Sequence, residues 1–390
     1  MFLENQHKAL YAAFDVYPTA KGAATHIYHF AGTLFDYKKG GWLSVLGSPK
    51  LPDYQWEKGV EITRFSEEIP NFLERTRAYG NYLFDLLADQ KNLEICHFRD
   101  PWSGIPILAQ KKEKKFLTVF EVNGLPSIEL PFRYPKIMAT TLHKIKQLEQ
   151  YCLQASDHIL VPSQVIRNYL LLSGVPSAKI KVIGNGAEIP QNLPYRDDLP
   201  EQYLIYFGAL QSWQGVDTLL RAMIHLADFS RLKLVICSSN RPRYSRPFQK
   251  LAEKLEIQHK IIWKHQLRKK ELYTWIKQAT LSVAPLKECS RNLQQGCSPL
   301  KVLESMALAT PVIASDIPAI REIMPDNSLG SFVRADRPIE LARSIRLLLD
   351  NPDYTQKLGE AAQEHIRQNH LWQQKKQELA QFYKEIEQGL

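Results

Sequence analysis

The sequence predicts an α/β protein built from two parallel-sheet domains that face each other across a cleft, and three observations support this fold class. A chain of 390 residues is long for one hydrophobic core and suits two domains of ordinary size. Short apolar runs alternate with segments of helical periodicity, as in a parallel sheet covered by helices on both faces. A stretch rich in proline and charge, 189–202, interrupts this alternation and is the best linker candidate. We therefore expect a first domain over 1–190 and a second over 191–371.

The elements follow from the apolar runs in order along the chain. In the first half we expect strands at 10–14, 43–46, 60–65, 94–98, 116–120, 158–161 and 181–183, with helical stretches between most of them. In the second half we expect strands at 203–207, 232–237, 261–263, 281–284 and 312–314. Helical periodicity marks 216–227 and 270–279. The charged amphipathic tail, 372–390, is expected to be a helix that packs back on the first domain.

Charge narrows the classes of ligand. Lysine and arginine exceed aspartate and glutamate by nine, with clusters at 111–115, 240–246 and 267–271. Such an excess suits nucleic acid, an anionic membrane surface or phosphorylated ligands. No recognition helix, RNP-like aromatic motif or zinc finger accompanies the clusters, which argues against nucleic acid. Contact with a membrane surface stays open, as does a solvated basic face without a partner.

Cysteine usage and apolar run lengths indicate the compartment. The chain has five scattered cysteines and no CxxC pair, so the sequence suggests neither a disulfide framework nor a zinc site. Residues 1–18 are interrupted by charge and do not resemble a signal peptide, and no apolar run approaches the length of a membrane span. We expect a cytoplasmic protein, either soluble or peripheral to the inner face of the membrane.

The stretch GCSPLKVLESMALATPVIASD, residues 296–316, predicts a helix start that suits an anion. Ser298 is a favourable N-cap and Pro299 suits the first helical position. The free N–H groups of that turn and the helix dipole favour a phosphate, which Gly296 would let approach the backbone. Lys301 and Glu304, three apart, share a polar side of the helix. The alternative is a capped core helix with a surface ion pair between these two residues.

Two further loops follow strands and contain small residues. Gly208 ends one expected strand and leads through 211–215 into the next helix. Gly22 and Ala23 follow the first expected strand and open the first long helix. A glycine after a strand is usually only a turn. The placement of all three loops at the carboxyl ends of strands, where open α/β sheets bind ligands, favours a ligand site.

These motifs together resemble the GT-B retaining glycosyltransferases of family four, over nearly the whole chain. The resemblance is carried by KGAATH near the start, EVNG at 121–124, LEQYCLQASDHILVPS at 148–163, KIKVIGNGAE at 179–188, FGALQSWQGVDTLL, and SPLKVLESMALATPVIASDIPAIREI, of which the last is the most specific. It implies a GT-B fold of two Rossmann-like domains around a central cleft.

The resemblance implies roles for the helix start. In the family, the residues corresponding to Ser298, Pro299 and Leu300 hold the donor diphosphate, and the glutamate corresponding to Glu304 binds the ribose. The loop around His265 and Gln266 matches the place where relatives hold the base. We therefore expect a donor site formed by Gly208, Gln214, His265, Gln266, Gly296, Ser298, Pro299, Leu300, Lys301 and Glu304.

This chain departs from the family pattern at three positions. Gly296 stands where many members have a first glutamate, and Ala209 and Gln214 stand where many have the arginine and lysine that contact the diphosphate. Lys301 is the nearest replacement cation. Arg291, Arg241 and Arg243 are further candidates.

In the first domain, Arg99, Glu121 and Asn123 follow expected strands and are our candidate catalytic residues. They would position acceptor and transferred sugar, or else they satisfy nearby backbone groups as ordinary loop residues. His26 and His97 are either cleft residues or packed histidines. The expected acceptor side of the cleft comprises Gly22, Ala23, His26 and Asn185.

The resemblance implies transfer of a hexose-type sugar from a nucleoside diphosphate sugar to a hydroxyl of a saccharide or glycolipid acceptor, with retention. A UDP sugar is the first candidate donor and GDP-mannose the second, and no metal or other cofactor is expected. Such an enzyme would serve polysaccharide or glycolipid biosynthesis. The alternatives are a GT-B nucleotide-sugar epimerase, or a noncatalytic protein that binds anions or a membrane surface.

Overall fold

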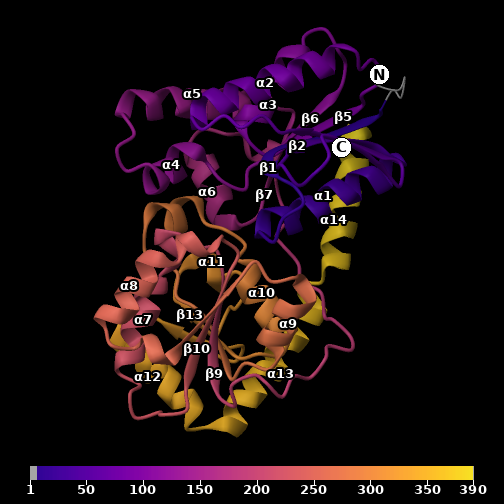
Figure 1. Cartoon of the computed structure of the whole chain (residues 1–390). Coiled ribbons are helices and arrows are strands. Elements are labelled where there is room, and N and C mark those ends of the chain that lie inside the picture. The colour runs from indigo at the N-terminus through magenta and orange to yellow at the C-terminus, as the bar shows by residue number, and fades with distance from the viewer. Residues whose placement is uncertain (1–6, 390) are drawn as a thin grey trace. The chain divides into compact units, whose positions relative to one another are not determined.

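The computed structural model describes residues 7–389 and divides them into two compact α/β units (Figure 1). The first unit contains residues 7–19, 23–184 and 376–389, and the second contains residues 20–22 and 185–375. Apart from the short segment 20–22, the chain changes unit at residues 184 and 375, whereas the sequence predicts divisions at 190 and 371. Residues 1–6, where the segment compared with a signal peptide begins, and Leu390, the end of the predicted tail helix, lie outside the described residues.

The first unit is built on an eight-stranded sheet in the order β3-β4-β2-β1-β5-β6-β7-β8. Every neighbouring pair is parallel except β3 with β4. The strands are β1 (Ala9–Val16), β2 (Gly41–Leu46), β3 (Tyr54–Glu57), β4 (Val60–Phe65), β5 (Ile95–Phe98), β6 (Leu117–Glu121), β7 (His158–Val161) and β8 (Ile180–Val182). Seven of them lie at or within a few residues of the predicted strands. β3 was not predicted, because this edge strand is mostly exposed and has no apolar run.

Helices between the strands cover this sheet. They are α1 (Gly22–Lys38), α2 (Phe72–Ala88), α3 (Pro101–Gln110), α4 (Pro126–Arg133), α5 (Ala139–Ala155) and α6 (Gln164–Leu172). The last helix, α14 (Trp372–Glu387), packs beside α1 (Figure 1), and the Tyr37 hydroxyl donates to Glu387 at 2.7 Å. On α14 the buried residues Leu379, Tyr383 and Ile386 recur at helical spacing, which buries one face of the helix in the first unit.

The second unit has a six-stranded parallel sheet in the order β11-β10-β9-β12-β13-β14. Its strands are β9 (Tyr203–Gly208), β10 (Lys233–Ser238), β11 (Ile261–His265), β12 (Leu281–Ala284), β13 (Val312–Ser315) and β14 (Ser331–Val333), and its helices are α7 (Val216–Ile224), α8 (Arg246–Lys254), α9 (Lys269–Lys277), α10 (Leu300–Ala307), α11 (Pro318–Arg321), α12 (Pro338–Leu349) and α13 (Pro352–Asn369). The first five strands match the predicted ones. β14 is only three residues long and was not predicted.

The strand orders identify where ligands are expected. Numbered within the second unit, the order is 3-2-1-4-5-6, the doubly wound arrangement that binds nucleotides where the strand order reverses. That switch point lies between β9 and β12. In the first unit the order reverses between β1 and β5. The two candidate sites described below lie at the carboxyl ends of these strands.

Candidate active site

In the second unit, the switch point brings Lys301 of α10 against the end of β9. Gly208 has a φ of +124°, a conformation that residues with a side chain rarely adopt. A Cβ atom at Gly208 would lie 3.8 Å from the Lys301 ammonium nitrogen. Glycine therefore keeps the backbone open on the side where the ammonium group lies.

The Lys301 side chain is half-buried, and its ammonium group contacts two uncharged groups. It lies 4.2 Å from the centre of the Tyr206 ring and donates a hydrogen bond to Oε1 of Gln214. Its described partners are thus an aromatic ring and an amide. Burial lowers the pKa of Lys301 to about 7, with a further lowering by nearby Arg291 against an opposing effect of Cys297. A site that supplies a cation without a paired carboxylate is suited to an anionic ligand.

Glu304 lies about one turn further along α10 and is also half-buried. Its Oε1 accepts a hydrogen bond of 3.2 Å from the hydroxyl of Tyr273, which belongs to α9. Burial raises the pKa of Glu304 to about 7, against the opposing effects of Lys269 and Tyr273. Lys301 and Glu304 therefore bond to different partners, which differs from the alternative of a solvated ion pair between them.

The helix start differs from the predicted cap. Pro299, not Ser298, occupies the N-cap position of α10, and no side chain caps the helix there. The Ser298 hydroxyl is turned to another segment, because its Oγ accepts from the backbone N–H of Asn185 at 3.0 Å. Asn185 Nδ2 in turn donates to the Ser298 carbonyl at 2.7 Å. Leu300 is thus the first helical residue, and the first turn of α10 has no capping side chain to compete with a ligand.

Asn185 itself lies in the second unit, whereas the sequence analysis placed it on the acceptor side of the first domain. The local reason is its pair of hydrogen bonds to Ser298. Asn185 therefore fixes the segment that precedes α10.

Gly296 precedes this segment with a φ of +66°. Its carbonyl accepts a hydrogen bond of 3.3 Å from Nη1 of Arg291, whose guanidinium lies 5.6 Å from the centre of the Trp213 ring. Arg291 is therefore close to Gly296, and its charge helps to lower the pKa of Lys301. The other two candidate cations, Arg241 and Arg243, are exposed in the turn after β10.

His265 and Gln266 lie at the end of the edge strand β11. Ser238 of β10 pairs with Gly208 on one side and with His265 on the other, so the three form a row at the carboxyl edge of the sheet. Two strand spacings separate His265 from Gly208 by about 10 Å. Gln266 has a φ of +49° and its N–H donates to the Ser238 carbonyl at 2.8 Å. These two residues lie on the same edge as Lys301 but do not contact it.

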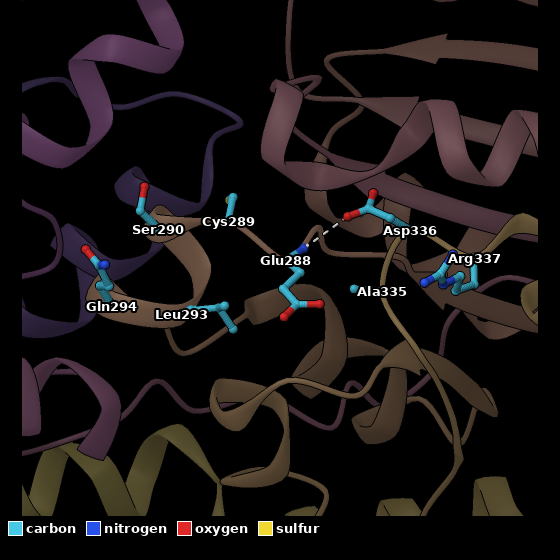
Figure 2. A pocket seen from close by; sticks show the side chains of 8 residues that line it. All are labelled: Glu288, Cys289, Ser290, Leu293, Gln294, Ala335, Asp336 and Arg337. Carbon is cyan, nitrogen blue, oxygen red and sulfur yellow. Dashed lines mark hydrogen bonds between the residues drawn. The ribbon is translucent and has the colours of Figure 1, made fainter.

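A pocket of 590 Å³ lies after β12 and β14 (Figure 2). Its lining residues belong to the loops that follow these strands: Glu288, Cys289, Ser290, Leu293, Gln294, Ala335, Asp336 and Arg337. Asp336 joins the two loops, because its Oδ2 accepts from the Glu288 backbone N–H at 3.2 Å. None of these residues was a predicted site residue, since these two loops carry no motif typical of a binding site.

In the first unit, β6 ends at Glu121, whose buried carboxylate receives contacts from five side chains. Two are donors from neighbouring strands: the Tyr11 hydroxyl at 2.8 Å and Arg99 Nε at 2.9 Å. The others are His26 Nε2 at 2.7 Å, His97 Nε2 at 3.0 Å, and Nδ2 of Asn123. The structure thus brings together all three predicted catalytic residues and both histidines.

This arrangement defines what Glu121 can do. Burial alone would raise the pKa of Glu121, but His26 and Arg99 outweigh that effect and hold the pKa well below its usual 4.5. A carboxylate has about four lone-pair sites, fewer than the groups around this one. Glu121 is therefore ionised at neutral pH and surrounded by partners, so it is a hub for these side chains and not an available base.

The open side of this cluster is formed by half-buried Asn123 and Asp15. Arg99 Nη1 donates to Asp15 at 2.9 Å while its Nε holds Glu121. Sequence reasoning missed Asp15, Tyr11 and Tyr383. Tyr11 lies in the apolar run of β1 and Tyr383, described below, lies in the amphipathic tail, so no local signal distinguished these two from core residues. Asp15 directly follows the expected strand 10–14, the same signal that selected Arg99 and Glu121.

Of the remaining predicted positions, Ala23 lies in the first unit and Gly22 in the second, whereas the sequence predicts both on the acceptor side of the first domain. They begin α1 directly after the loop that follows β1. His26 lies one turn later on the same helix and contacts Glu121.

Two family models cover most of the chain. The model described as glycosyltransferase family 4 matches residues 20–189, and the model described as glycosyl transferases group 1 matches residues 194–365. The two matched ranges follow one another with almost no gap.

Curated relatives carry related names. D-inositol 3-phosphate glycosyltransferase of Streptomyces coelicolor is 26% identical over 242 residues, which are 60% of this chain and 51% of that protein. The lipopolysaccharide core biosynthesis mannosyltransferase LpcC of Rhizobium leguminosarum is 28% identical over 196 residues, 48% of this chain and 52% of that protein. In both alignments the chain spans about half the length of the relative. An uncharacterized glycosyltransferase of Methanocaldococcus jannaschii is 19% identical over 95% of this chain and 96% of its own length.

Solved structures share the fold. Sucrose-phosphate synthase of Thermosynechococcus elongatus superposes with a TM-score of 0.80 at 18% identity, over 98% of this chain and 100% of that chain. HepE of Anabaena, in complex with UDP and glucose, superposes with a TM-score of 0.74 at 13% identity, over 97% and 99%. The comparisons confirm the predicted fold class and resemblance: the chain belongs to the GT-B glycosyltransferases of family four, the glycosyl transferases group 1.

Proposed function

We propose that the protein transfers a hexose-type sugar from a nucleoside diphosphate sugar to a hydroxyl of a saccharide or glycolipid acceptor, with retention and without a metal ion. The observation that carries this proposal is the pair Lys301 and Glu304 at the start of α10. Both are half-buried at the switch point of a doubly wound sheet, and neither is neutralised by the other. Strongly shifted charged groups at such a place are typical of functional sites.

The geometry suits the leaving nucleoside diphosphate. The uncapped first turn of α10 and the Lys301 ammonium would bind the diphosphate and stabilise the charge that develops on it as the sugar leaves. The Glu304 carboxylate would accept hydrogen bonds from the ribose hydroxyls. His265 and Gln266, on the same sheet edge, would lie beside the base.

In the first unit, Arg99 and Asn123 would orient the acceptor or the transferred sugar from the open side of the Glu121 cluster. Glu121 would act by fixing these two side chains. A UDP sugar is the first candidate donor, supported by the binding of UDP to the structural neighbour HepE. GDP-mannose is the second, supported by the name of the mannosyltransferase LpcC.

The proposed place of action is the cytoplasm. All five cysteines are free in the structure, and three of them are buried, which suits a reducing compartment. Within residues 7–389, no helix has both the length and the apolar character needed to cross a bilayer. Contact with a membrane surface is proposed only if the acceptor is a glycolipid.

Nucleoside diphosphates test the donor site without knowledge of the acceptor. We expect UDP or GDP to raise the melting temperature with EDTA present, because a ligand at one hundred times its Kd adds about 2.7 kcal/mol to the free energy of unfolding. Uridine and guanosine, which lack the diphosphate, are the controls and should have a much smaller effect. A rise in melting temperature that vanishes in EDTA contradicts metal-independent binding.

Replacing Glu304 by glutamine tests the ribose contact. This variant keeps the shape of the side chain but removes its charge, and hydrogen bonds to charged groups contribute about 1.5 to 3 kcal/mol. We expect calorimetry to show donor affinity reduced by at least about tenfold, with little change in melting temperature. Glu253→Gln on α8, which removes an exposed glutamate, is the matched control. Equal donor affinity in the wild type and Glu304→Gln contradicts the ribose assignment.

A further inference from the structure

The C-terminal helix contributes one side chain to the Glu121 cluster. Tyr383 of α14 is fully buried in the first unit. Its hydroxyl oxygen lies 2.7 Å from Nδ1 of His97, a residue 286 positions earlier in the chain. The two rings meet edge to face, with their centres 6.0 Å apart. The contact therefore joins the last helix to β5.

Nε2, the other ring nitrogen of His97, lies close to Glu121. His97 Nε2 lies 3.0 Å from Oε2 of Glu121. Burial lowers the pKa of His97 and outweighs the opposing effect of Glu121, so the ring is neutral at neutral pH. A neutral imidazole has one N–H and one lone pair, and which nitrogen carries the proton depends on its two partners.

The two partners select one tautomer. A lone pair on Nε2 would face the negative charge of Glu121, whereas a proton on Nε2 faces it favourably, 3.0 Å away. Nδ1 is then the acceptor, and it needs a donor. Burial raises the pKa of Tyr383 well above 10, so its hydroxyl keeps its proton and can donate to Nδ1. The resulting chain of contacts runs from Tyr383 through His97 to Glu121.

We infer that Tyr383 is a positioning residue for the transfer reaction: its hydroxyl orients His97, which holds one oxygen of Glu121. The other oxygen of Glu121 contacts Arg99, His26 and Asn123, among which Arg99 and Asn123 reach the open side of the cluster. The inference rests on the proposed function. It extends that function to a side chain that lies behind the site and touches neither donor nor acceptor.

Tyr383→Phe tests the role in transfer. The variant keeps the ring, and so its packing against Phe382 and Tyr37, but it removes the donor to Nδ1. Because small displacements of positioned groups slow a reaction strongly, we expect kcat to fall about tenfold while the KM for the donor stays within about twofold. Tyr37→Phe is the matched control, since it removes a hydroxyl bonded to Glu387 near the surface, and its kcat should equal that of the wild type.

A purely structural role gives a different result. In that case Tyr383→Phe lowers the melting temperature but leaves kcat per folded molecule unchanged, and the inference is overturned. A variant that fails to fold does not remove the test, because the tautomer can be measured in the wild type.

Nitrogen-15 NMR of histidine-labelled wild-type protein reports the tautomer without any need for activity. We expect His97 to carry its proton on Nε2 and none on Nδ1 at neutral pH. A proton on Nδ1 overturns the proposed orientation of His97. If the wild type transfers no sugar from any nucleoside diphosphate sugar, the proposed function fails and the role in transfer fails with it. The NMR result still decides the tautomer of His97 by itself, so the two failures are distinguishable.

Discussion

Replacing Glu121 by glutamine should reduce transfer by at least about a hundredfold and lower the free energy of unfolding by about 3 kcal/mol at neutral pH. Glutamine has the same shape, but it removes the negative charge that faces buried Arg99 and two histidines. A buried charge that loses its partner costs several kcal/mol. Arg99 retains only Asp15, which is partly exposed, so its guanidinium is expected to shift. Denaturant unfolding and steady-state kinetics measure the two effects.

The pH dependence separates this effect from general damage to the core. Glu121 has a lower pKa folded than unfolded, so its stabilising contribution is complete above about pH 4.5 and is lost as the pH falls through the folded pKa. The difference in stability between wild type and Glu121→Gln should therefore be largest at neutral pH and shrink in acid.

Glu149→Gln is a matched control from the same unit. Burial raises the pKa of Glu149 to about 7, against opposing hydrogen bonds from Ser127. A carboxyl with a raised pKa destabilises the fold as the pH rises from its unfolded value towards 7. The Glu149→Gln variant should thus gain stability relative to the wild type as the pH rises towards 7, the opposite of Glu121→Gln. Parallel pH curves for the two variants would contradict the proposed charge state of Glu121.

Lys301→Ala should weaken the binding of a nucleoside diphosphate by about 1 to 3 kcal/mol, the range of a hydrogen bond to a charged group, and should affect the nucleoside much less. The Lys301 ammonium nitrogen lies 3.8 Å from a Cβ atom built at Gly208, so its loss would remove the proposed cationic contact to the diphosphate at the switch point. Calorimetry with UDP, GDP and their nucleosides measures the difference. Lys250→Ala, which removes an exposed lysine of α8, is the control. Equal losses for the diphosphate and the nucleoside would refute the assignment.

The shifted pKa of Lys301 predicts how binding of the donor depends on pH. A bound anion favours the protonated lysine, so the affinity for a nucleoside diphosphate sugar should fall as the pH rises above about 7. Protonation of Glu304 should weaken the ribose contact as the pH falls below about 7. The affinity should therefore peak near neutrality. Lys301→Ala should lose the alkaline decline and keep the acid one.

Some strands can be predicted from a short stretch of sequence alone, and others cannot. Buried parallel strands were predictable because each is a short apolar run between turns, as in β9 and β12. Two edge strands, β3 and β14, were not predicted, because β3 is mostly exposed without an apolar run and β14 has only three residues. The other two edge strands, β8 and β11, were predicted from their short apolar runs, so the position of a strand in its sheet does not by itself decide whether the sequence reveals it.

In the candidate sites, too, a local sequence pattern predicts some features and misses others. The helix start at α10 was predictable within two residues, but the cap was wrong, because a rule about neighbouring residues cannot include the hydrogen bond that Asn185 donates to Ser298. The cation Lys301 and the carboxylate Glu304 were predicted from spacing and resemblance. Their shifted pKa values follow from burial, which spacing does not report. Tyr383 was unpredictable, since its partner His97 is distant in sequence.

The first unit is made of segments that precede and follow the second unit in the sequence, and this affects how the first unit folds during translation. Domains generally fold in the order in which the ribosome releases them. Here β5 and β6 leave the ribosome early, but the part of α14 that supplies Tyr383 is made only after the second unit. Until then His97 lacks the donor to its Nδ1 atom, and the sheet face that α14 covers stays open to water. While the second unit, almost half the chain, is being translated, the first unit therefore lacks α14. During that time it is accessible to chaperones and proteases.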